Sequence, residues 1–301
     1  MKNVINILAA VILLAACTKT EVTYDSPSEI AFAPVAEGMT KVAVEGETYL
    51  NGPGFNAFAN TSDGVSYFAN VSFEKGSETS DGLAVYVGDP TQYWPRTKSL
   101  LFAGYSGAMV VDDPNKDDDD IVFNGTSLSI EGYQQSVDND LMWFFTGQVN
   151  KSTPIISPTM KHACSWITIN VTGENACGEW SITNMTLNSV STSGNVTFTS
   201  DKATWSSLGA GQAIELFTGS TKIKEFESVE AIVIPQPPTT LTIGYNGKTT
   251  DPAIPLDYNG SSAWEAGKHY TYTLNFLNPY TIEFSVSGVT DWSDPKEIVM
   301  Q

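Results

Sequence analysis

Few residues in this chain have the types and spacing that enzyme chemistry requires. His162 and His269 are the only histidines, and neither belongs to an HExxH motif or to another paired spacing. The stretch GYSGA at 104–108 has alanine where a GxSxG nucleophile elbow needs its second glycine. The stretch GPGFNA at 52–57 lacks the strand-to-helix context of a phosphate-binding loop. We therefore expect the protein not to be an enzyme.

The densest group of potential metal ligands is an acidic run, DDPNKDDDD at residues 112–120. Its spacing matches the first three ligand positions of an EF-hand calcium loop. However, Asp118 replaces the glycine that the loop needs for its turn, and Asn124 stands where a bidentate glutamate is required. Because a block of like charges repels itself and favours a solvated loop, we predict no metal site and no cofactor.

One cysteine, Cys17, has the context of a lipid attachment site. It follows an apolar run, residues 7–16, which is shorter than the roughly 20 residues that cross a bilayer and which fits the core of a signal peptide. Leu14-Ala15-Ala16-Cys17 resembles the bacterial lipobox, after which the cysteine is acylated with chains such as palmitate. We expect residues 1–16 to be a lipoprotein signal peptide and Cys17 to anchor the mature chain in the outer membrane. An ordinary secretory signal is the alternative.

Two further cysteines, Cys164 and Cys177, remain in the mature chain. In an oxidising exterior they can form a disulfide across a short β-hairpin, and the alternative is a pair of buried free thiols. The sequence leaves both possibilities open. Zinc is disfavoured because the two residues belong to no CxxC motif and have no added histidine pattern.

The charge balance limits the partners that the protein can have. The chain has 34 acidic residues against 15 basic ones, a formal net charge of −19. Nucleic acid and anionic lipid headgroups both attract basic surfaces. We therefore expect no nucleic-acid partner, and a membrane association that depends on the lipid anchor alone.

The body of the chain alternates between apolar and polar residues, as β-strands do. Residues 270–276 place tyrosine, leucine and phenylalanine on one face and threonine and asparagine on the other. The same alternation resumes at 281–286 after Asn278-Pro279, which predicts a hairpin with one wet face. Shorter runs of this kind recur at 65–73, 83–87, 167–171, 196–198 and 241–245. The sequence predicts an all-β protein built from β-sandwiches.

The strongest signal for a domain boundary is the stretch VNKSTPIISPTMKHA at 149–163, where two prolines and polar residues separate strand-like runs. We predict an N-terminal β-sandwich domain at 17–150 and a C-terminal one at 151–301. The indoles of Trp94, Trp143 and Trp166 lie in apolar runs, which favours core packing over sugar binding.

Seven segments stand out together and in a fixed order. They are EIAFAPVAEGMTKVAV (29–44), FNAFAN (55–60), YWPRTKSLLFAGYS (93–106), DNDLMWFF (138–145), MKHACSWITINV (160–171), VIPQ (233–236) and WEAGKHYTYTLNF (264–276). In this order, behind a lipobox, they resemble the fimbrillin family of Bacteroidales, the subunits and accessory proteins of type V pili. The resemblance extends over nearly the whole mature chain.

This resemblance implies two tandem transthyretin-like β-sandwich domains and export as a surface lipoprotein. In structural subunits of the family, a trypsin-like protease cuts after a basic residue beyond the first strand, which removes lipid and strand together. The C-terminal segment of a neighbouring fimbrillin subunit then fills the groove. On this chain the resemblance places the first strand at Ile30 and Phe32 and the processing site at Lys41, where arginine is more usual.

The residues themselves support part of this sequence of events. Ile30 and Phe32 alternate, so a sandwich that loses their strand exposes an apolar slot with unpaired backbone groups. Each buried unpaired group costs about 1–3 kcal/mol, which makes the slot an acceptor for an added strand. The candidate donor is SDPKEIVMQ (293–301), with Ile298 and Met300 on one face. The alternatives are a solvated turn at Lys41 and a tail that pairs within its own domain.

The leading hypothesis is a polymerising pilus subunit that supports adhesion. The first alternative is a fimbrial anchor or accessory protein that keeps its lipid and its first strand. The second alternative is a surface glycan-binding lipoprotein.

Overall fold

The computed structural model describes residues 28–36, 54–78, 84–106, 120–135, 139–153, 155–257, 263–278 and 281–292. In these ranges the protein consists of β-strands and two short 3₁₀ helices, η3 (Asn175–Glu179) and η4 (Ile223–Glu225), with no α-helix. The all-β prediction is confirmed.

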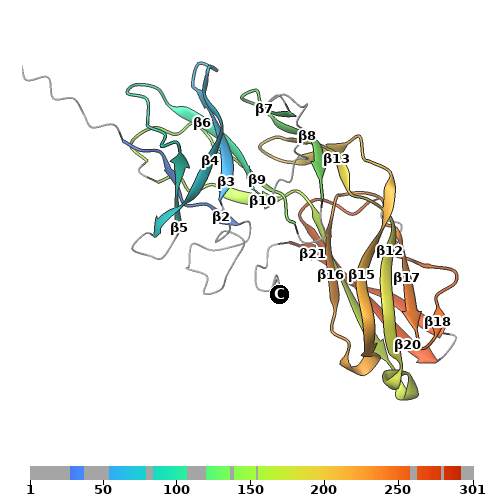
Figure 1. The fold of residues 1–301 in the computed structure, drawn as a ribbon. Helices are drawn as coiled ribbons and strands as arrows, with labels where there is room; N and C mark the ends of the chain where they lie inside the picture. The colour runs from blue at the N-terminus through green and yellow to red at the C-terminus, as the bar shows by residue number, and fades with distance from the viewer. Residues whose placement is uncertain are drawn as a thin grey trace, which may run out of the picture.

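The N-terminal half forms an eight-stranded sheet, which we call the first sheet (Figure 1). Its order is β1 (Ala31–Phe32), β5 (Ala84–Asp89), β4 (Ser66–Glu78), β3 (Phe55–Thr61), β6 (Leu100–Ser106), β9 (Met142–Phe145), β10 (Thr159–His162) and β2 (Val35–Ala36). The sheet therefore continues past residue 150, the predicted boundary, as far as His162.

The C-terminal half forms a sandwich of two sheets. One has the order β16 (Val229–Val233), β11 (Ser165–Gly173), β20 (Lys268–Asn278) and β21 (Thr281–Asp291). The other has the order β15 (Gly211–Lys222), β12 (Ser181–Ser191), β17 (Thr240–Tyr245) and β18 (Lys248–Thr249), and β19 (Ile254–Pro255) pairs with β17. Strands β20 and β21 are antiparallel, as the predicted hairpin requires.

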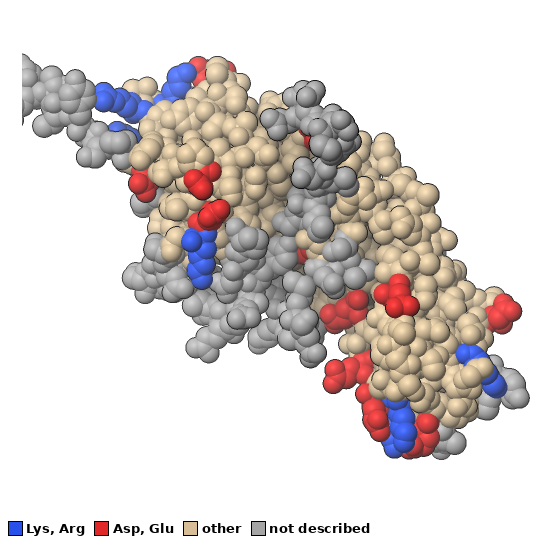
Figure 2. Space-filling model, in the orientation of Figure 1, with Lys and Arg blue, Asp and Glu red and all other residues tan. Residues whose placement is uncertain are grey.

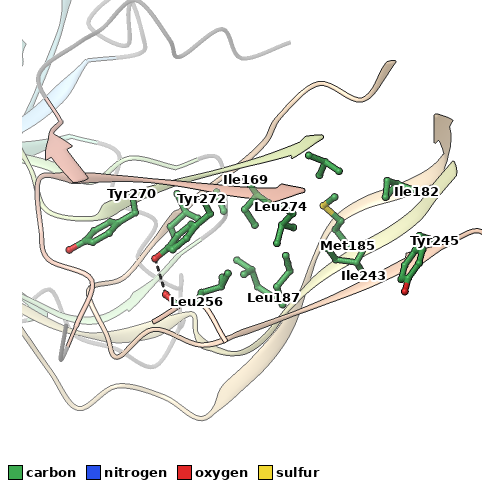
Figure 3. Packing of buried hydrophobic residues seen from close by; sticks show 14 of the residues in the cluster. Ile169, Ile182, Met185, Leu187, Ile243, Tyr245, Leu256, Tyr270, Tyr272 and Leu274 are labelled. Atoms are coloured by element: carbon green, nitrogen blue, oxygen red, sulfur yellow. Dashed lines mark hydrogen bonds between the residues drawn. The ribbon is translucent and has the colours of Figure 1, made fainter. Parts of the chain in front are cut away.

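Alternation along β20 builds the core of this C-terminal sandwich (Figure 3). Tyr270, Tyr272 and Leu274 point inward and share one buried cluster with Met185 and Leu187 from the facing sheet. The hydroxyl of the fully buried Tyr272 donates a hydrogen bond to the carbonyl oxygen of Leu256 at 3.0 Å. Burial raises the pKa of Tyr272 to about 12, so this phenol keeps its proton and its hydrogen bond.

A fourth sheet, which we call the bridging sheet, combines strands from both halves of the chain. Its order is β14 (Ala203–Ser206), β13 (Ser193–Phe198), β8 (Leu128–Gln134) and β7 (Ile121–Phe123). Figure 1 shows β7, β8 and β13 between the first sheet and the C-terminal sandwich. Because β8 precedes the predicted boundary and β13 follows it, the two halves share backbone hydrogen bonds as well as a hydrophobic cluster.

The disulfide considered for Cys164 and Cys177 is not formed, and both are buried free thiols. The segment between them is the nine-residue strand β11 followed by η3, rather than a hairpin. A strand of that length rises about 30 Å, whereas a disulfide needs Cα atoms within about 7 Å. The two side chains accordingly belong to different hydrophobic clusters.

Candidate assembly site

Residues 28–36, which we call the closing segment, pair with the strands at both ends of the first sheet. Through β1, Ala31 lies opposite Val87 and Phe32 lies opposite Tyr86, antiparallel to β5. Through β2, Val35 and Ala36 pair in parallel with β10. Since β1 and β2 are the two ends of the strand order, a single stretch of chain closes the sheet.

Backbone hydrogen bonds fix the closing segment on both sides. On the β5 side, the N–H of Ile30 donates to the carbonyl of Gln92 at 2.8 Å, and the N–H of Trp94 donates to Ser28 at 2.8 Å. On the β10 side, Ile156 accepts from Ala33 at 2.8 Å and donates to Ala31 at 2.9 Å, while Pro158 accepts from Val35 at 3.0 Å. Loss of the segment would leave all these groups of its neighbours unpaired.

The closing segment also supplies two side chains to the hydrophobic cluster of the first sheet. Ile30 and Phe32 are both 0% exposed, so they are as buried as the sequence alternation predicts. The ring of Phe32 meets four other phenylalanine rings, those of Phe55, Phe73, Phe102 and Phe144, at centroid distances of 5.5, 4.8, 5.3 and 5.8 Å. Three of these contacts are edge-on, the geometry that aromatic quadrupoles favour.

A glycine on β6 makes room for this aromatic cluster. A Cβ atom on Gly104 would lie 2.3 Å from a ring carbon of Phe144 and 2.7 Å from the carbonyl oxygen of Asn56. Any side chain at Gly104 would therefore displace the Phe144 ring from its position beside Phe32. The glycine allows β6 to approach the aromatic layer closely.

Charged groups stay at the surface around this apolar slot. Glu29, at the start of the closing segment, is exposed, and its backbone forms an isolated antiparallel β-bridge with Tyr93. On the face seen in Figure 2, the described acidic and basic side chains are scattered, and most of the described surface is neither acidic nor basic.

Several of the other predicted site residues lie outside the part of the chain that the structure describes. Cys17, Lys41, Ile298 and Met300 lie outside the described residues, as does the acidic run except for Asp120. The described tryptophans behave as predicted: Trp94, Trp143 and Trp166 are 7%, 2% and 3% exposed and belong to the core. Their burial removes these three indoles as platforms on which a sugar could stack.

Sequence reasoning missed a row of four rings at the junction of the two halves. The ring of His162 stacks on the ring of Trp292, whose centroid lies 5.7 Å from that of Trp166. Trp166 in turn stacks on His269, with ring centroids 3.7 Å apart. Nδ1 of His162 lies 2.7 Å from a carboxylate oxygen of the buried Asp140. Burial lowers the pKa of His269 to about 4. No motif spacing signals this arrangement, because its members are far apart in the chain.

The described ranges contain neither a membrane-spanning helix nor a cluster of metal ligands. None of their helices is long and apolar enough to cross a membrane. Within the same ranges, no three His, Cys, Asp or Glu side chains come together in a way that could hold a metal ion.

One family model matches most of the chain, and solved structures share its fold. The sequence profile described as fimbrillin-like matches residues 40–292. A candidate cell adhesion protein from Bacteroides uniformis superposes with a TM-score of 0.61 at 17% identity, with 88% of this chain and 99% of that one covered. A fimbrial protein from Bacteroides vulgatus gives 0.54 at 15% identity, with 88% and 99% covered. At these identities the superpositions establish the fold alone. No curated protein matches the sequence.

Proposed function

Because this chain belongs to the fimbrillin-like family, we propose that it is a structural subunit of a cell-surface pilus that supports adhesion. In this proposal the chain reaches the outer membrane as a lipoprotein through Cys17. A trypsin-like protease then cuts after Lys41, and a strand from another fimbrillin subunit replaces the closing segment. In this proposal the chain is a structural part of the pilus and has no enzymatic role in it.

The double pairing of the closing segment is the observation that carries the proposal. The segment occupies both edges of the first sheet and fills the aromatic cluster with Phe32. A sheet without it would have two open edges on either side of an apolar slot. Buried unpaired backbone groups each cost about 1–3 kcal/mol, so the opened slot favours a replacement strand that restores both edges.

The position of Lys41 fits a processing site. Residues 37–54 connect the closing segment to β3, and Lys41 lies in that connection. A cut there would separate the closing segment, together with the lipid on Cys17, from the rest of the protein. Every other strand of the first sheet would remain on one continuous chain.

Mass spectrometry of the N-terminus of surface fibres tests this proposal. We expect assembled subunits to begin at Val42. We also expect Lys41→Ala to leave the chain uncut and unpolymerised, while the exposed control Lys202→Ala assembles normally. Fibres whose subunits begin at lipidated Cys17 would contradict the polymerising role.

A second candidate is a fimbrial anchor that keeps its lipid and its closing segment. The completeness of the pairing favours it, because the uncut chain already satisfies Gln92, Ile156 and Pro158. The same mass spectra separate the two candidates: an anchor would begin at lipidated Cys17 and would be a minor component at the base of the fibre.

A further inference from the structure

Strand β21 forms the end of a sheet in the C-terminal sandwich. It is the last strand in the order β16-β11-β20-β21, and within the described ranges β20 is the one strand that pairs with it. Its other side therefore presents backbone N–H and C=O groups that can pair with another chain. Proteins usually protect such an edge with short strands, bulges, prolines or charged side chains, lysine above all.

The remaining edges of this sandwich have that protection. Strand β16 has five residues, and β18 and β19 have two each, with Pro255 in β19. Strand β15 is longer, but its register against β12 shifts at three places. Strand β21 has eleven residues, and its sequence TIEFSVSGVTD contains no lysine, arginine or proline. Its acids are Glu283 and Asp291, and Asp291 forms an ion pair with Lys268. Strand β21 is therefore the edge most open to strand addition.

The inner face of β21 is apolar and incompletely covered. Ile282, Phe284 and Val286 pack against the core of the sandwich and are half-buried. The ring of Phe284 stacks on that of Tyr272, with centroids 5.6 Å apart. The alternate residues from 281 to 285 are exposed. A further strand beside β21 would cover apolar surface that these three inward side chains still expose, which is favourable.

We propose that β21 of one copy pairs with β21 of a second copy, antiparallel and about a two-fold axis at Phe284. Opposed residues lie on the same face of a sheet, and faces alternate along a strand. The axis of such a pair therefore passes through a residue rather than between two. The register of β21 against β20 shifts between Val286 and Gly288. An axis at Phe284 uses the whole run before that shift, residues 281–287.

The side chains of β21 are complementary to themselves in this register. Ile282 of one copy lies opposite Val286 of the other, and the two Phe284 side chains meet at the axis. On the outer face, Glu283 lies opposite Ser285 of the other copy, so the two carboxylates are offset. An axis at Glu283 would place the carboxylates directly opposite each other, which is destabilising. This self-complementarity identifies the occupant of the edge as a second copy of the chain.

The contact goes beyond the proposed function. It is isologous, so it closes at two copies, and it involves neither the closing segment nor the first sheet. It therefore joins two copies side by side, whether the chain is a polymerising subunit or an anchor. Copies held close together on one surface would strengthen so small a contact through their high effective concentration.

Cysteine trapping in cells that produce the full chain tests the pairing. One copy carries Glu283→Cys, and a second copy with a different tag carries Ser285→Cys; both positions are exposed. Opposed Cβ atoms lie about 4.5–5.5 Å apart, whereas diagonal neighbours lie about 7–8 Å apart, which is too far for a disulfide. After oxidation we expect a disulfide-linked dimer with both tags when the two variants are produced together, and none when either is produced alone.

A carbodiimide, which joins an amine directly to a carboxylate, gives a second test. Ser285→Lys places an amine opposite Glu283 of the other copy, so we expect a covalent dimer, and adding Glu283→Gln should abolish it. The matched control is Ser220→Lys, at an exposed serine of the edge strand β15, and it should give no dimer.

The outcomes of both tests are decisive. Absence of a dimer with both tags overturns the pairing, and equal dimers in the single cysteine variants overturn the axis at Phe284. A carbodiimide dimer that survives Glu283→Gln also contradicts the register. The wild-type chain, treated in parallel, measures any cross-link through the native cysteines. None of these results depends on cleavage at Lys41 or on the presence of fibres, so the pilus proposal stands or fails separately.

Discussion

His162 and Trp292 stack face to face, with ring centroids 4.1 Å apart and ring planes within 8° of parallel. His162 is the last residue of β10 in the first sheet, and Trp292 directly follows β21 in the C-terminal sandwich. Trp292 is 3% exposed, and its N–H donates to the carbonyl of Gly267 at 2.8 Å. The point where the C-terminal tail begins is therefore held against both halves of the molecule.

Replacement of Trp292 should destabilise the protein and the end of β21 in particular. We expect Trp292→Ala to lower the free energy of unfolding by about 3–5 kcal/mol, the usual cost of removing a buried aromatic side chain. Hydrogen exchange should quicken at the end of β21. The control is Trp180→Ala, which removes a half-buried indole stacked on Tyr245 and should cost less. Equal losses for the two variants in urea denaturation would contradict a special role for Trp292.

Replacement of Phe32 should destabilise the uncut chain strongly. Phe32→Ala leaves a cavity among four rings, and we expect the free energy of unfolding to fall by about 3–5 kcal/mol. The control Val35→Ala truncates a half-buried residue of the same segment and should cost about 1 kcal/mol, since fewer buried methyl groups are lost. Urea denaturation of the uncut protein measures both, and a small loss for Phe32→Ala would argue against the aromatic slot as the anchor of the segment.

The Asp140–His162 pair should show strong coupling. Their side chains are 2% and 8% exposed, and the interacting atoms lie 2.7 Å apart. Removal of His162 leaves the buried Asp140 without this hydrogen-bond partner, and an unsatisfied buried acceptor costs about 1–3 kcal/mol. We expect the double variant Asp140→Ala/His162→Ala to lose at least about 1 kcal/mol less than the sum of the single variants. Strict additivity in the denaturation cycle would show that the pair does not act as a unit.

Alternation of apolar and polar residues predicts the buried face correctly in some strands and wrongly in others. Alternation predicted the β20–β21 hairpin because β20 buries the same face from Tyr270 to Phe276. In β4 the same rule is misleading: Tyr67 is 39% exposed, whereas Phe68 is buried. The pairing shifts between Ala57 and Ala59, next to Asn70 with its positive φ of 49°, and this bulge reverses the faces.

The candidate site was only half predictable for a related reason. The burial of Ile30 and Phe32 follows from local alternation, which a short stretch of sequence contains. The pairing of the same segment with Val87 on one side and Thr159 on the other depends on contacts between distant parts of the chain. The stack of His162 on Trp292 is equally non-local, and no motif encodes it.

The pKa of His269 predicts a loss of stability in acid. Burial lowers the pKa of this imidazole from 6.5 to about 4, so between these values the unfolded chain binds the proton and the folded chain does not. The contribution of His269 to stability is therefore complete above pH 6.5 and is lost as the pH falls toward 4, by up to about 3 kcal/mol at about 1.4 kcal/mol per pH unit.

The variant His269→Gln provides the control for this pH effect. It keeps a polar group near Thr168, whose hydroxyl lies 2.8 Å from Nε2 of His269, but it cannot titrate. We expect the difference in unfolding free energy between wild type and variant to shrink steadily from pH 7 to pH 4.5. A difference that stays constant over that range would show that His269 titrates normally in the folded protein.

The bridging sheet predicts that the two halves unfold together. Val196 on β13 pairs with Ile130 on β8, and Phe198 stacks on Trp143 of the first sheet with centroids 5.4 Å apart. Because neither half can open without breaking these contacts, we expect one cooperative transition when tryptophan fluorescence and far-UV circular dichroism are followed in urea. Phe198→Ala should weaken this coupling and separate the two signals, whereas Phe276→Ala, inside the C-terminal sandwich alone, should lower stability without separating them. Two distinct transitions in the wild-type protein would show that the halves behave as independent domains despite the sheet they share.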